Sequence, residues 1–446
     1  MTRYSSLVVA DDLTGANDTG QQFATAGLDT VVIPSHSTRR PDADVLVVDT
    51  DTRTSDPQSA TAAVRDTVST VLATQTYKKV DSTLRGNISA EIDAALSAVP
   101  SSLALVAPAF PAMGRITVGG YHLVDGIPVS EAPAVQEREN PPTESTLTAL
   151  FAESEYPTAH VSIETVASGS TAVATRLREI QQVQNAVVSF DAATDIHLHT
   201  IVDAGRRLEE TPLYVGSAGL GAAFGQRVSA PTSTTTSSDV TETVNADRVL
   251  GVVGSTNQRT FDQLRRVPDE FIVTLDIERA IDDPTGAGTV LASAARDRLH
   301  SDGIAVITSA VSNADVTAAL DHGKTHEIGS ESVRNTILTA LITAVSSLWT
   351  EHPPDAVFAS GGTVAGAVFE TLEIDAIELG TESVEQTVPL TTATARDGRR
   401  IALATKAGGF GSDDAIVNCL TALGAKMTAL KESGTDTNDS NDDDNG

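Results

Sequence analysis

Residues 7–20, LVVADDLTGANDTG, contain the pattern that decides the fold. The short apolar run Leu7–Ala10 is typical of a strand that is buried on both faces. Two acids, Asp11 and Asp12, follow this run, and the residues after them lead into a helical segment. A buried strand that leads directly into a helix is the repeating unit of a parallel α/β sheet.

The same alternation continues along the N-terminal part of the chain. Helical spacing of apolar residues predicts helices over residues 60–73 and 88–98. Short apolar runs predict buried strands at Leu7–Ala10, Val31–Ile33, Val45–Val48, Lys79–Val80 and Leu103–Val106. This order of elements predicts a mainly parallel sheet whose strands are connected by helices.

A polar stretch interrupts the alternation and indicates a second domain. Residues 229–246, SAPTSTTTSSDVTETVNA, are rich in Ser and Thr, which is typical of a linker. The alternation resumes with VLGVVGSTN at Val249–Asn257. We therefore predict an α/β protein with two domains, at residues 1–228 and 247–432. Residues 433–446 are polar and acidic, and we expect a disordered tail there.

Length and charge exclude several classes of protein. The chain has 446 residues, which is enough for two or three domains, and 40% of them are hydrophobic. It carries 60 acidic and 30 basic residues, for a formal net charge of −30. Because a net anionic surface repels phosphates, we expect no nucleic acid partner.

The sequence also argues against a membrane or disulfide-bonded protein. No segment supplies the roughly 18 uncharged apolar residues of a membrane span, and the N-terminus MTRYSSLVVADD does not resemble a signal peptide. We therefore predict a cytoplasmic protein that does not contact the membrane. The only cysteine, Cys419, cannot form an intramolecular disulfide, and we interpret it as a core residue.

Lysine is scarce in this chain. It occupies six of the 30 basic positions, which leaves 24 arginines. Few lysines and many acids suggest a halophilic protein that works in molar salt, where the Debye length shrinks to about 3 Å and self-repulsion is screened.

Polar residues follow the predicted strands, where ligands of open α/β sheets bind. Carboxylates such as Asp11 and Asp12 can accept hydrogen bonds from a polyol or deprotonate a hydroxyl group. One of them can instead cap the next helix, and Asp12 is the better functional candidate. Arg53 follows the third strand, where it either binds a carboxylate through two parallel hydrogen bonds or lies solvated on the surface.

The stretch KKVDSTLRGN, residues 78–87, predicts an anion-binding site. It combines Lys79, Asp81, Ser82 and Arg85 with a helix that begins near Asn87. Farther along, residues 106–131 are dense in Pro and Gly, which is typical of an irregular loop. Arg115 and His122 in this segment could contact a substrate or simply stabilise the loop.

Three strand ends in the second domain predict phosphate binding. They read GSTN from Gly254, SGGT from Ser360 and KAGGFG from Lys406. Glycines let backbone N–H groups approach phosphates, and a lysine neutralises their charge. The chain has no P-loop motif. The stretch GSAGLG, residues 216–221, weakly resembles a dinucleotide turn, which leaves an oxidoreductase as a remote alternative.

These motifs resemble the four-carbon acid sugar kinase family in their order along the chain. VVADDLTGANDTG, TDTR, KKVDSTLRGN, APAFPAMGR, GGYHLVDG, GSAGL, VVGSTN, SGG and KAGGFG carry the resemblance over roughly residues 4–425. The family implies a sugar-acid-binding domain, a nucleotide-binding domain and phosphoryl transfer in the cleft between them. Its members use ATP to phosphorylate a hydroxyl of threonate, erythronate or their oxo derivatives.

The resemblance also implies roles for individual residues. Asp12 would orient the reacting hydroxyl, and ATP would bind with Mg²⁺, whose protein ligands the sequence leaves open. Around the substrate we expect Asp12, Arg53, Lys79, Asp81, Ser82, Arg85 and His122. Around the nucleotide we expect Ser255, Ser360, Gly361, Gly362, Thr363, Lys406 and Gly408.

One position departs from the family pattern. The family usually has SGGDTA, whereas this chain has Thr363 in place of the acid. A catalytically weak nucleotide- and sugar-acid-binding protein with a regulatory role therefore stays open as an alternative. The sequence does not decide between a monomer and a homodimer.

Overall fold

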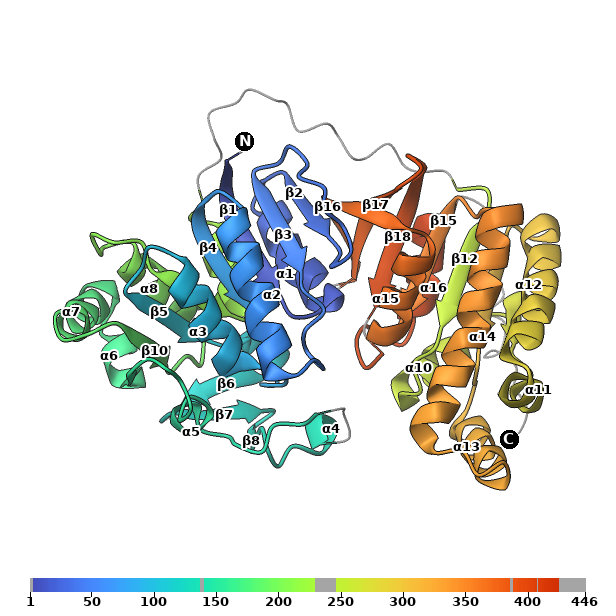
Figure 1. Ribbon diagram of the computed structural model, residues 1–446, viewed down its shortest axis with the longest axis horizontal. Coiled ribbons are helices and arrows are strands. Elements are labelled where there is room, and N and C mark those ends of the chain that lie inside the picture. Colours follow the sequence, from blue (N-terminus) through green and yellow to red (C-terminus); the bar gives the residue numbers. More distant parts are fainter. Residues whose placement is uncertain (1–2, 137–139, 229–245, 386–387, 407, 425–446) are drawn as a thin grey trace, which may run out of the picture. The chain divides into compact units, whose positions relative to one another are not determined.

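A computed structural model describes residues 3–136, 140–228, 246–385, 388–406 and 408–424 (Figure 1). The chain divides into two compact units, Met1–Ser238 (unit 1) and Asp239–Gly446 (unit 2). The predicted linker lies outside the described residues except for Ala246, and the predicted tail lies wholly outside them.

Unit 1 is built on a parallel sheet. Every neighbouring pair of its described strands runs parallel, which confirms the predicted α/β fold. In their order across the sheet the strands are β2 (Thr30–Ile33), β3 (Val45–Asp49), β1 (Tyr4–Ala10), β4 (Ala73–Lys79), β11 (Leu213–Gly216), β5 (Leu103–Ala107), β10 (Ala186–Phe190) and β9 (Thr158–Val161).

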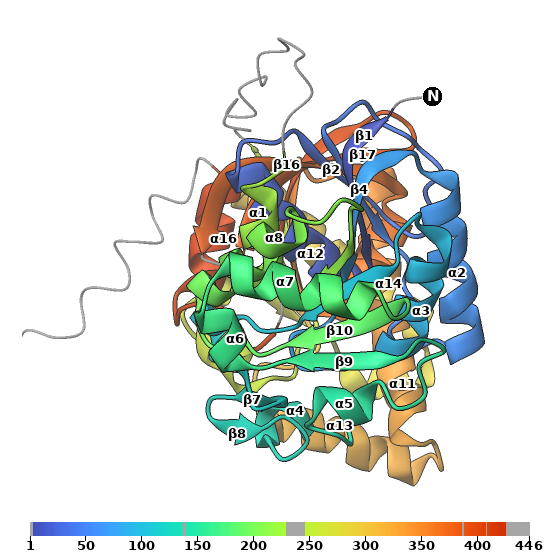
Figure 2. The ribbon, with the colours of Figure 1, turned by 90° about the vertical axis from the view of Figure 1, so that its left-hand side faces the viewer.

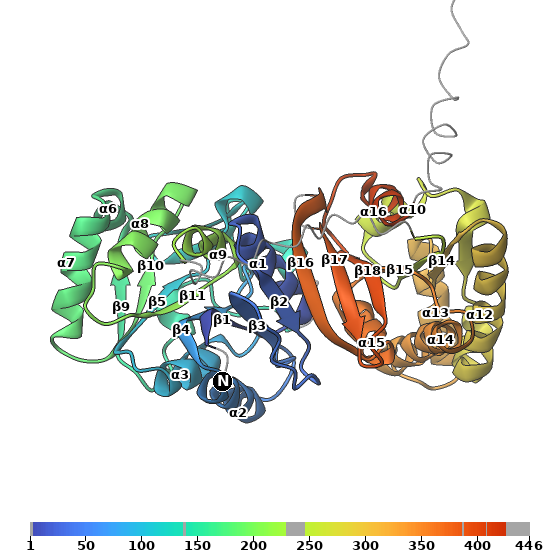
Figure 3. The same cartoon turned by 90° about the horizontal axis from the view of Figure 1, so that it is seen from above.

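Helices cover both faces of this sheet. One face carries α1 (Leu13–Thr25), α9 (Ala218–Gly225), α8 (Asp195–Gly205) and α7 (Ser170–Gln181), and the other carries α2 (Pro57–Thr70) and α3 (Ile88–Ala98) (Figure 3). Figure 2 shows the edge formed by β9 and β10, with α6 (Ile163–Ala167) and α7 beside it. Shorter helices are α4 (Pro133–Gln136) and α5 (Leu147–Leu150), with a 3₁₀ turn at Pro111–Met113.

The sequence prediction was wrong about the limits of α2 and β4. The predicted helix over residues 60–73 is α2, which ends at Thr70, and the predicted strand at residues 79–80 is β4, which begins at Ala73. The strand escaped detection because its residues, ATQTYKK, form no apolar run. This central strand buries Lys78, whose ammonium lies 2.7 Å from a Glu91 carboxylate oxygen on α3.

The predicted irregular loop over residues 106–131 contains a small antiparallel sheet instead. Its strands are β6 (Arg115–Val118), β7 (Tyr121–Val124) and β8 (Ile127–Pro128). Two-residue turns connect them, and Gly119, Gly120, Asp125 and Gly126 all have positive φ. Tight hairpin turns favour Gly-Gly and Asp-Gly for this reason, so these two dipeptides are the sequence signal for the hairpins.

This small sheet is fixed at the carboxyl edge of the main sheet. Asp191, just after β10, accepts hydrogen bonds of 2.9 and 2.8 Å from the N–H groups of Gly119 and Gly120. Thr117 forms a bridge with Ala192 beside it. The sheet therefore places β7 next to the loops that follow the main strands.

Unit 2 is a second α/β sheet, as predicted, with two antiparallel strands at one end. The pairs from β13 to β18 are parallel, and β17 and β16 run antiparallel to their neighbours. In sheet order the strands are β13 (Ile272–Thr274), β14 (Ile304–Thr308), β12 (Val249–Val253), β15 (Ala356–Ser360), β18 (Arg400–Lys406), β17 (Val388–Ala395) and β16 (Ile374–Glu385).

The helices of unit 2 also form two layers. One face carries α10 (Gln258–Leu264) and α16 (Ala415–Leu423), and the other carries α12 (Pro284–Ser301), α14 (Ser330–Glu351) and α15 (Gly362–Thr371) (Figure 3). The remaining elements are α11 (Ile277–Asp282), α13 (Asn313–Thr325) and a 3₁₀ turn at Asp269–Phe271. Cys419 lies in the core of this unit, where burial raises its pKa to about 12.

None of the helices in the described ranges combines the length and the apolarity that crossing a bilayer requires.

The buried pair of Lys78 and Glu91 gives a stability prediction. Both side chains are almost fully buried, so Glu91→Gln leaves an ammonium group in the core without its counter-charge. We expect a loss of about 3–5 kcal/mol in the free energy of unfolding, measured by chemical denaturation in molar KCl. The exposed pair of Arg176 and Glu179 is the control, and Glu179→Gln should change stability by less than about 0.5 kcal/mol. Equal effects of the two substitutions would contradict the prediction.

Candidate functional site

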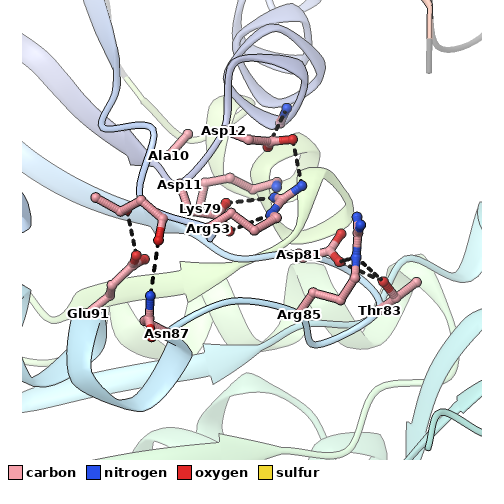
Figure 4. A network of polar contacts seen from close by, with 12 residues as sticks. Ala10, Asp11, Asp12, Arg53, Lys79, Asp81, Thr83, Arg85, Asn87 and Glu91 are labelled. Carbon is pink, nitrogen blue, oxygen red and sulfur yellow. Dashed lines mark hydrogen bonds and ion pairs between the residues drawn. The ribbon is translucent and has the colours of Figure 1, made fainter. Parts of the chain in front are cut away.

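Arg53 joins the two acids that follow β1. Its Nε and Nη2 donate to the two carboxylate oxygens of Asp11 at 2.8 Å each, and its Nη1 donates to Asp12 at 2.5 Å (Figure 4). Asp12 also caps α1, because its Oδ1 accepts from the Gly15 N–H at 2.9 Å. The structure therefore makes Asp12, and not Asp11, the capping acid. It brings Arg53 to the predicted site with its donors directed at the protein's own carboxylates.

The charges of this cluster stabilise one another. Burial alone would raise the pKa of Asp11, but the charges of Arg53 and Lys79 outweigh it and lower the pKa to about 2. Burial would likewise raise the pKa of Asp81, and the charges of Arg85 and Arg53 hold it well below its usual range. Both carboxylates are therefore ionised at neutral pH.

Lys79 contributes a buried positive charge at the end of β4. Its side chain is only 4% exposed, and no hydrogen bond or ion pair to its ammonium occurs among the described residues. Gly15 makes room for it, because a Cβ at that position would lie 2.4 Å from both the Lys79 Nζ and the Asp12 Oδ1. The ammonium is therefore available to an anionic ligand beside Asp12 (Figure 4).

The loop after β4 holds Asp81 and Arg85 together. Asp81 accepts hydrogen bonds of 2.6 Å from the Arg85 Nε and from the Thr83 hydroxyl. No hydrogen bond to the two Nη groups of Arg85 occurs in the part of the chain that the structure describes. Arg85 is thus anchored at one edge of its guanidinium and can bind a ligand with the other.

His122 lies beneath this loop and is fully buried on β7. Its Nε2 is 2.9 Å from the Ser82 carbonyl oxygen, and its Nδ1 is 3.0 Å from the Thr117 hydroxyl. Burial lowers the pKa of His122 to about 4, so the ring is neutral and donates its Nε2–H to Ser82. His122 therefore orients the backbone at Ser82, whose side chain is half-buried.

Asn87 also differs from its expected role. It occupies the position before α3 but caps no helical N–H group with its side chain. Its amide donates instead to the Thr52 and Ser55 carbonyl oxygens at 3.0 and 2.9 Å. Asn87 thereby fastens the loop after β3 to the loop after β4.

Sequence reasoning missed Asp18 on α1. Burial raises the pKa of Asp18 to about 6, with a further increase from Asp12 and opposing effects from Lys79 and Arg115. Asp18 lies three residues after Gly15, so it shares the helix face against which Lys79 lies. The helical spacing of Asp12, Gly15 and Asp18 is the sequence signal that could have found it.

The three predicted phosphate-binding loops of unit 2 follow neighbouring strands whose carboxyl ends are aligned. Val253 pairs with Ser360, and Ser360 pairs with Lys406, at the ends of β12, β15 and β18. The Gly361 N–H donates to the Lys406 carbonyl oxygen at 3.0 Å, and the Gly254 N–H donates to that of Ser360 at 3.2 Å. The loops from Gly254, Gly361 and Gly408 are therefore neighbours.

Lys406 and Ser255 organise these loops. The Lys406 ammonium donates to the carbonyl oxygens of Gly408 and Phe410 at 3.0 and 3.2 Å, and burial lowers its pKa to about 8. The Thr260 hydroxyl lies 2.9 Å from the Ser255 hydroxyl and 2.8 Å from the Gly408 carbonyl oxygen. Gly408 has no space for a side chain, because a Cβ would lie 2.0 Å from the Ser255 Oγ.

The start of α15 offers backbone N–H groups. No side chain caps this helix, and its first turn contains Gly362 and the exposed Thr363 but no acid. The Ser360 hydroxyl just before it is buried and has no hydrogen-bond partner among the described residues. Free N–H groups at a helix N-terminus bind anions such as phosphate.

The dinucleotide-like stretch at residues 216–221 has a packing role. A Cβ at Gly216 would lie 2.6 Å from the Ala107 carbonyl oxygen, and a Cβ at Gly219 would lie 2.6 Å from that of Ala109. Ser217 caps α9 and donates its hydroxyl to Ala109. These glycines allow close contact between protein segments, so they give no support to a dinucleotide site.

The two units thus carry different sites at the carboxyl edges of their sheets. Unit 1 has buried cations beside carboxylates, and unit 2 has glycine-rich loops around a lysine. This arrangement defines a two-domain α/β protein whose sites suit a small anionic ligand in unit 1 and a phosphate-containing ligand in unit 2.

Comparison with known proteins gives the family. Residues 6–224 match a sugar-binding N-terminal domain, and residues 250–416 match a nucleotide-binding C-terminal domain. The chain belongs to the four-carbon acid sugar kinase family. This finding confirms the resemblance to that family in the order of the sequence motifs.

Individual relatives match over nearly their whole length. The D-threonate kinase of Salmonella typhimurium is 30% identical, with 93% of this chain and 97% of the relative covered. The D-erythronate kinase of Heliobacterium modesticaldum is 29% identical, with 95% and 98% covered. The 3-oxo-tetronate kinase of Methylobacterium radiotolerans is 29% identical, with 91% and 96% covered.

Solved structures share the fold. A protein from Salmonella typhimurium LT2 superposes with a TM-score of 0.77 at 23% identity, covering 94% of this chain and 99% of that one. Protein HI1011 from Haemophilus influenzae superposes with a TM-score of 0.72 at 22% identity, covering 93% and 99%.

The electrostatics of unit 1 predict how Asp18 titrates. Its carboxyl group should have a pKa of about 6, and Lys79→Met should raise that pKa further, because the nearby ammonium favours the ionised form. Carboxyl-carbon NMR across a pH titration measures both values. Lys324→Met removes an exposed lysine in unit 2 and should leave Asp18 unchanged. An unchanged Asp18 pKa in Lys79→Met would show that the ammonium does not face this carboxylate.

Proposed function

We propose that this protein is an ATP-dependent kinase that phosphorylates a hydroxyl group of a four-carbon sugar acid. The observation that carries the proposal is the buried ammonium of Lys79, which has no partner among the described residues and lies beside Asp12 at the carboxyl edge of unit 1. The names of the relatives support the same reaction, because they are kinases of threonate, erythronate and 3-oxo-tetronate.

The substrate site of the proposal is assembled from the loops of unit 1. Lys79 and the free edge of Arg85 would bind the carboxylate of the acid, and the Ser82 hydroxyl would bind one of its hydroxyl groups. Arg53 and Asp81 would hold these groups in position, and His122 would do so through the Ser82 backbone. Fixed positive charges suit a small acid because the protein does not need to reorganise when it binds.

Two carboxylates would act on the reacting hydroxyl group. Asp12 would orient it, since this side chain is already fixed by Arg53 and by the N-terminus of α1. Asp18 would accept its proton, because a base with a pKa of about 6 matches neutral conditions better than a fully acidic carboxylate. The hydroxyl oxygen then bonds to the γ-phosphorus of ATP, and the bond from that phosphorus to the ADP oxygen breaks.

The nucleotide site of the proposal lies in unit 2. Backbone N–H groups of Gly362 and Thr363 in the first turn of α15 would bind phosphate oxygens, while the Gly361 N–H is held by the Lys406 carbonyl oxygen. Lys406 would neutralise their charge, and Ser255, Ser360 and Gly408 would line the same loops. The buried Ser360 hydroxyl supports this assignment, because it has no protein partner in the described part of the chain.

Magnesium fits the oxygen donors of these loops. Mg²⁺ in such sites is held by nucleotide phosphates and only one or two protein oxygens. Ser255, Ser360 and Thr363 offer hydroxyl oxygens, and Asp413 adds an exposed carboxylate. When bound, the ion would neutralise phosphate charge, so the carboxylate that Thr363 replaces is not the only oxygen available.

We also propose that the protein works in the cytoplasm of a cell with molar internal salt. Its lysines support this view, because three of the four described ones are buried at the sites or in the core and only Lys324 is exposed. A surface poor in lysine and rich in acids depends on screening of its own repulsion.

The test of the proposal is ADP release in molar KCl with Mg-ATP and a panel of threonate, erythronate and their oxo forms. Mass spectrometry of the product shows whether the acid gained a phosphoryl group. A phosphorylated acid supports the kinase and identifies its substrate. Thermal stabilisation by ATP without product from any acid would favour the weak binding protein that Thr363 suggests.

Asp18→Asn tests the proposed base. The variant should lower kcat by about 100- to 10,000-fold, because general base catalysis contributes about that much. In the parent enzyme, kcat/KM should fall as the pH drops through about 6, when Asp18 becomes protonated, and the variant should lose this limb. Asp195→Asn changes an exposed acid on α8 and serves as the control. A variant with the parent kcat and pH profile would remove Asp18 from the mechanism.

A further inference from the structure

The ends of α11 and α13 bring two histidines and an aspartate together in unit 2. His322 lies in the last turn of α13, and His326 is its C-cap four residues later, so their rings lie on one face of the helix. Asp282 is the last residue of α11, which lies beside α13 (Figure 1). One ligand atom from each of the three side chains lies within 4.8 Å of the others, and no second group of this kind occurs among the described residues.

The hydrogen bonds of His326 leave a lone pair facing the aspartate. Its Nδ1 lies 3.0 Å from the His322 carbonyl oxygen, so this nitrogen carries the hydrogen and donates. Its Nε2 lies 3.3 Å from the Asp282 Oδ1. Two acceptors at this distance repel each other unless a metal ion binds both of them or the Nε2 takes up a proton and forms an ion pair with the carboxylate. A backbone acceptor on the other ring nitrogen is also the usual way in which proteins orient a metal-binding histidine.

His322 adds a nitrogen with no partner. Its Nε2 is covered from solvent and makes no hydrogen bond with any described residue. The ring centroids of His322 and His326 are 4.5 Å apart. A covered polar atom without a partner is costly, and coordination of a metal ion would satisfy it.

The surroundings favour a cation. The C-terminal end of α13 carries the negative end of the helix dipole. A hollow next to His322 is lined by Asp276, Glu278, Asp315 and Asp321. Asp321 pairs with Lys324, and the negative potential of the other three groups attracts cations to the mouth of the cluster.

We propose that His322, His326 and Asp282 form a binding site for one divalent transition-metal ion of the zinc class. Two imidazole nitrogens and a carboxylate oxygen are a ligand set typical of Zn²⁺, whereas Mg²⁺ and Ca²⁺ prefer oxygens alone. With metal–ligand bonds of about 2.0 Å, tetrahedral ligands lie about 3.3 Å apart, which matches the distance between His326 and Asp282. The ion ties the end of α11 to the end of α13, and a water molecule completes its coordination. The site uses none of the residues of the proposed kinase reaction.

Titration of the purified full chain with ZnCl₂ tests the proposal. Isothermal titration calorimetry in molar KCl should show one saturable site, because the salt suppresses diffuse binding to the acidic surface. His326→Ala and Asp282→Asn should each weaken binding at least tenfold, since changes even in the residues that support metal ligands cost 10- to 100-fold. Saturating Zn²⁺ should raise the Tm of the parent protein but not that of His326→Ala. These residues are at least partly exposed, so the variants should melt like the parent without metal.

A second histidine pair provides the matched control. His300 and His352 have rings 5.1 Å apart in the same unit but belong to no group with a third metal-binding side chain in the described residues. The double variant His300→Ala/His352→Ala should keep the parent affinity for Zn²⁺. Absence of a saturable site in the parent, or equal affinity in His326→Ala, would overturn the proposal and leave a simple ion pair between His326 and Asp282. Activity of the kinase does not enter either readout, so failure here is independent of the proposed function.

Discussion

The ion pair between Arg53 and Asp11 is the interaction on which the site of unit 1 depends. It is buried, and it joins the loops that follow β1 and β3. Because the same guanidinium also binds Asp12, one cation bridges two carboxylates. Without Arg53, the ammonium of Lys79 would be the nearest counter-charge for both acids. The arginine therefore keeps Lys79 available for an anionic ligand.

The second site follows from the register of the sheet in unit 2. Since the ends of β12, β15 and β18 are aligned, their loops converge without long connections. Lys406 then fixes the third loop through two carbonyl oxygens. Both candidate sites thus contain a buried lysine, Lys79 in unit 1 and Lys406 in unit 2. The chain has only six lysines, so these two positions stand out.

The sheets could be predicted from the sequence, and the polar residues of the candidate sites could be located at strand ends, because both are local patterns. Apolar runs predict strands, and the polar residues after them must meet at the carboxyl edge of a parallel sheet. Polar β4 escaped because its stability comes from a distant partner, Glu91. Asp18 escaped because its pKa depends on burial, which no short motif encodes. The partners of Arg53 could not be predicted either, since an arginine near a strand end can pair with the protein or with a ligand.

Burial of its charged side chains would allow the candidate site of unit 1 to bind an anion in molar salt. At about 1 M salt the Debye length is about 3 Å, so interactions between exposed charges are largely lost while buried ones are screened much less. Lys79 and Asp11 are buried, and the side chain of Arg53 is only 14% exposed. When a small acid binds this ammonium, it leaves the solvent in which salt screens charges. Its attraction to the Lys79 ammonium is then screened much less. A cation on the surface could not select the same acid against molar chloride, so the burial of its lysines would suit this protein to the molar salt that we propose for it.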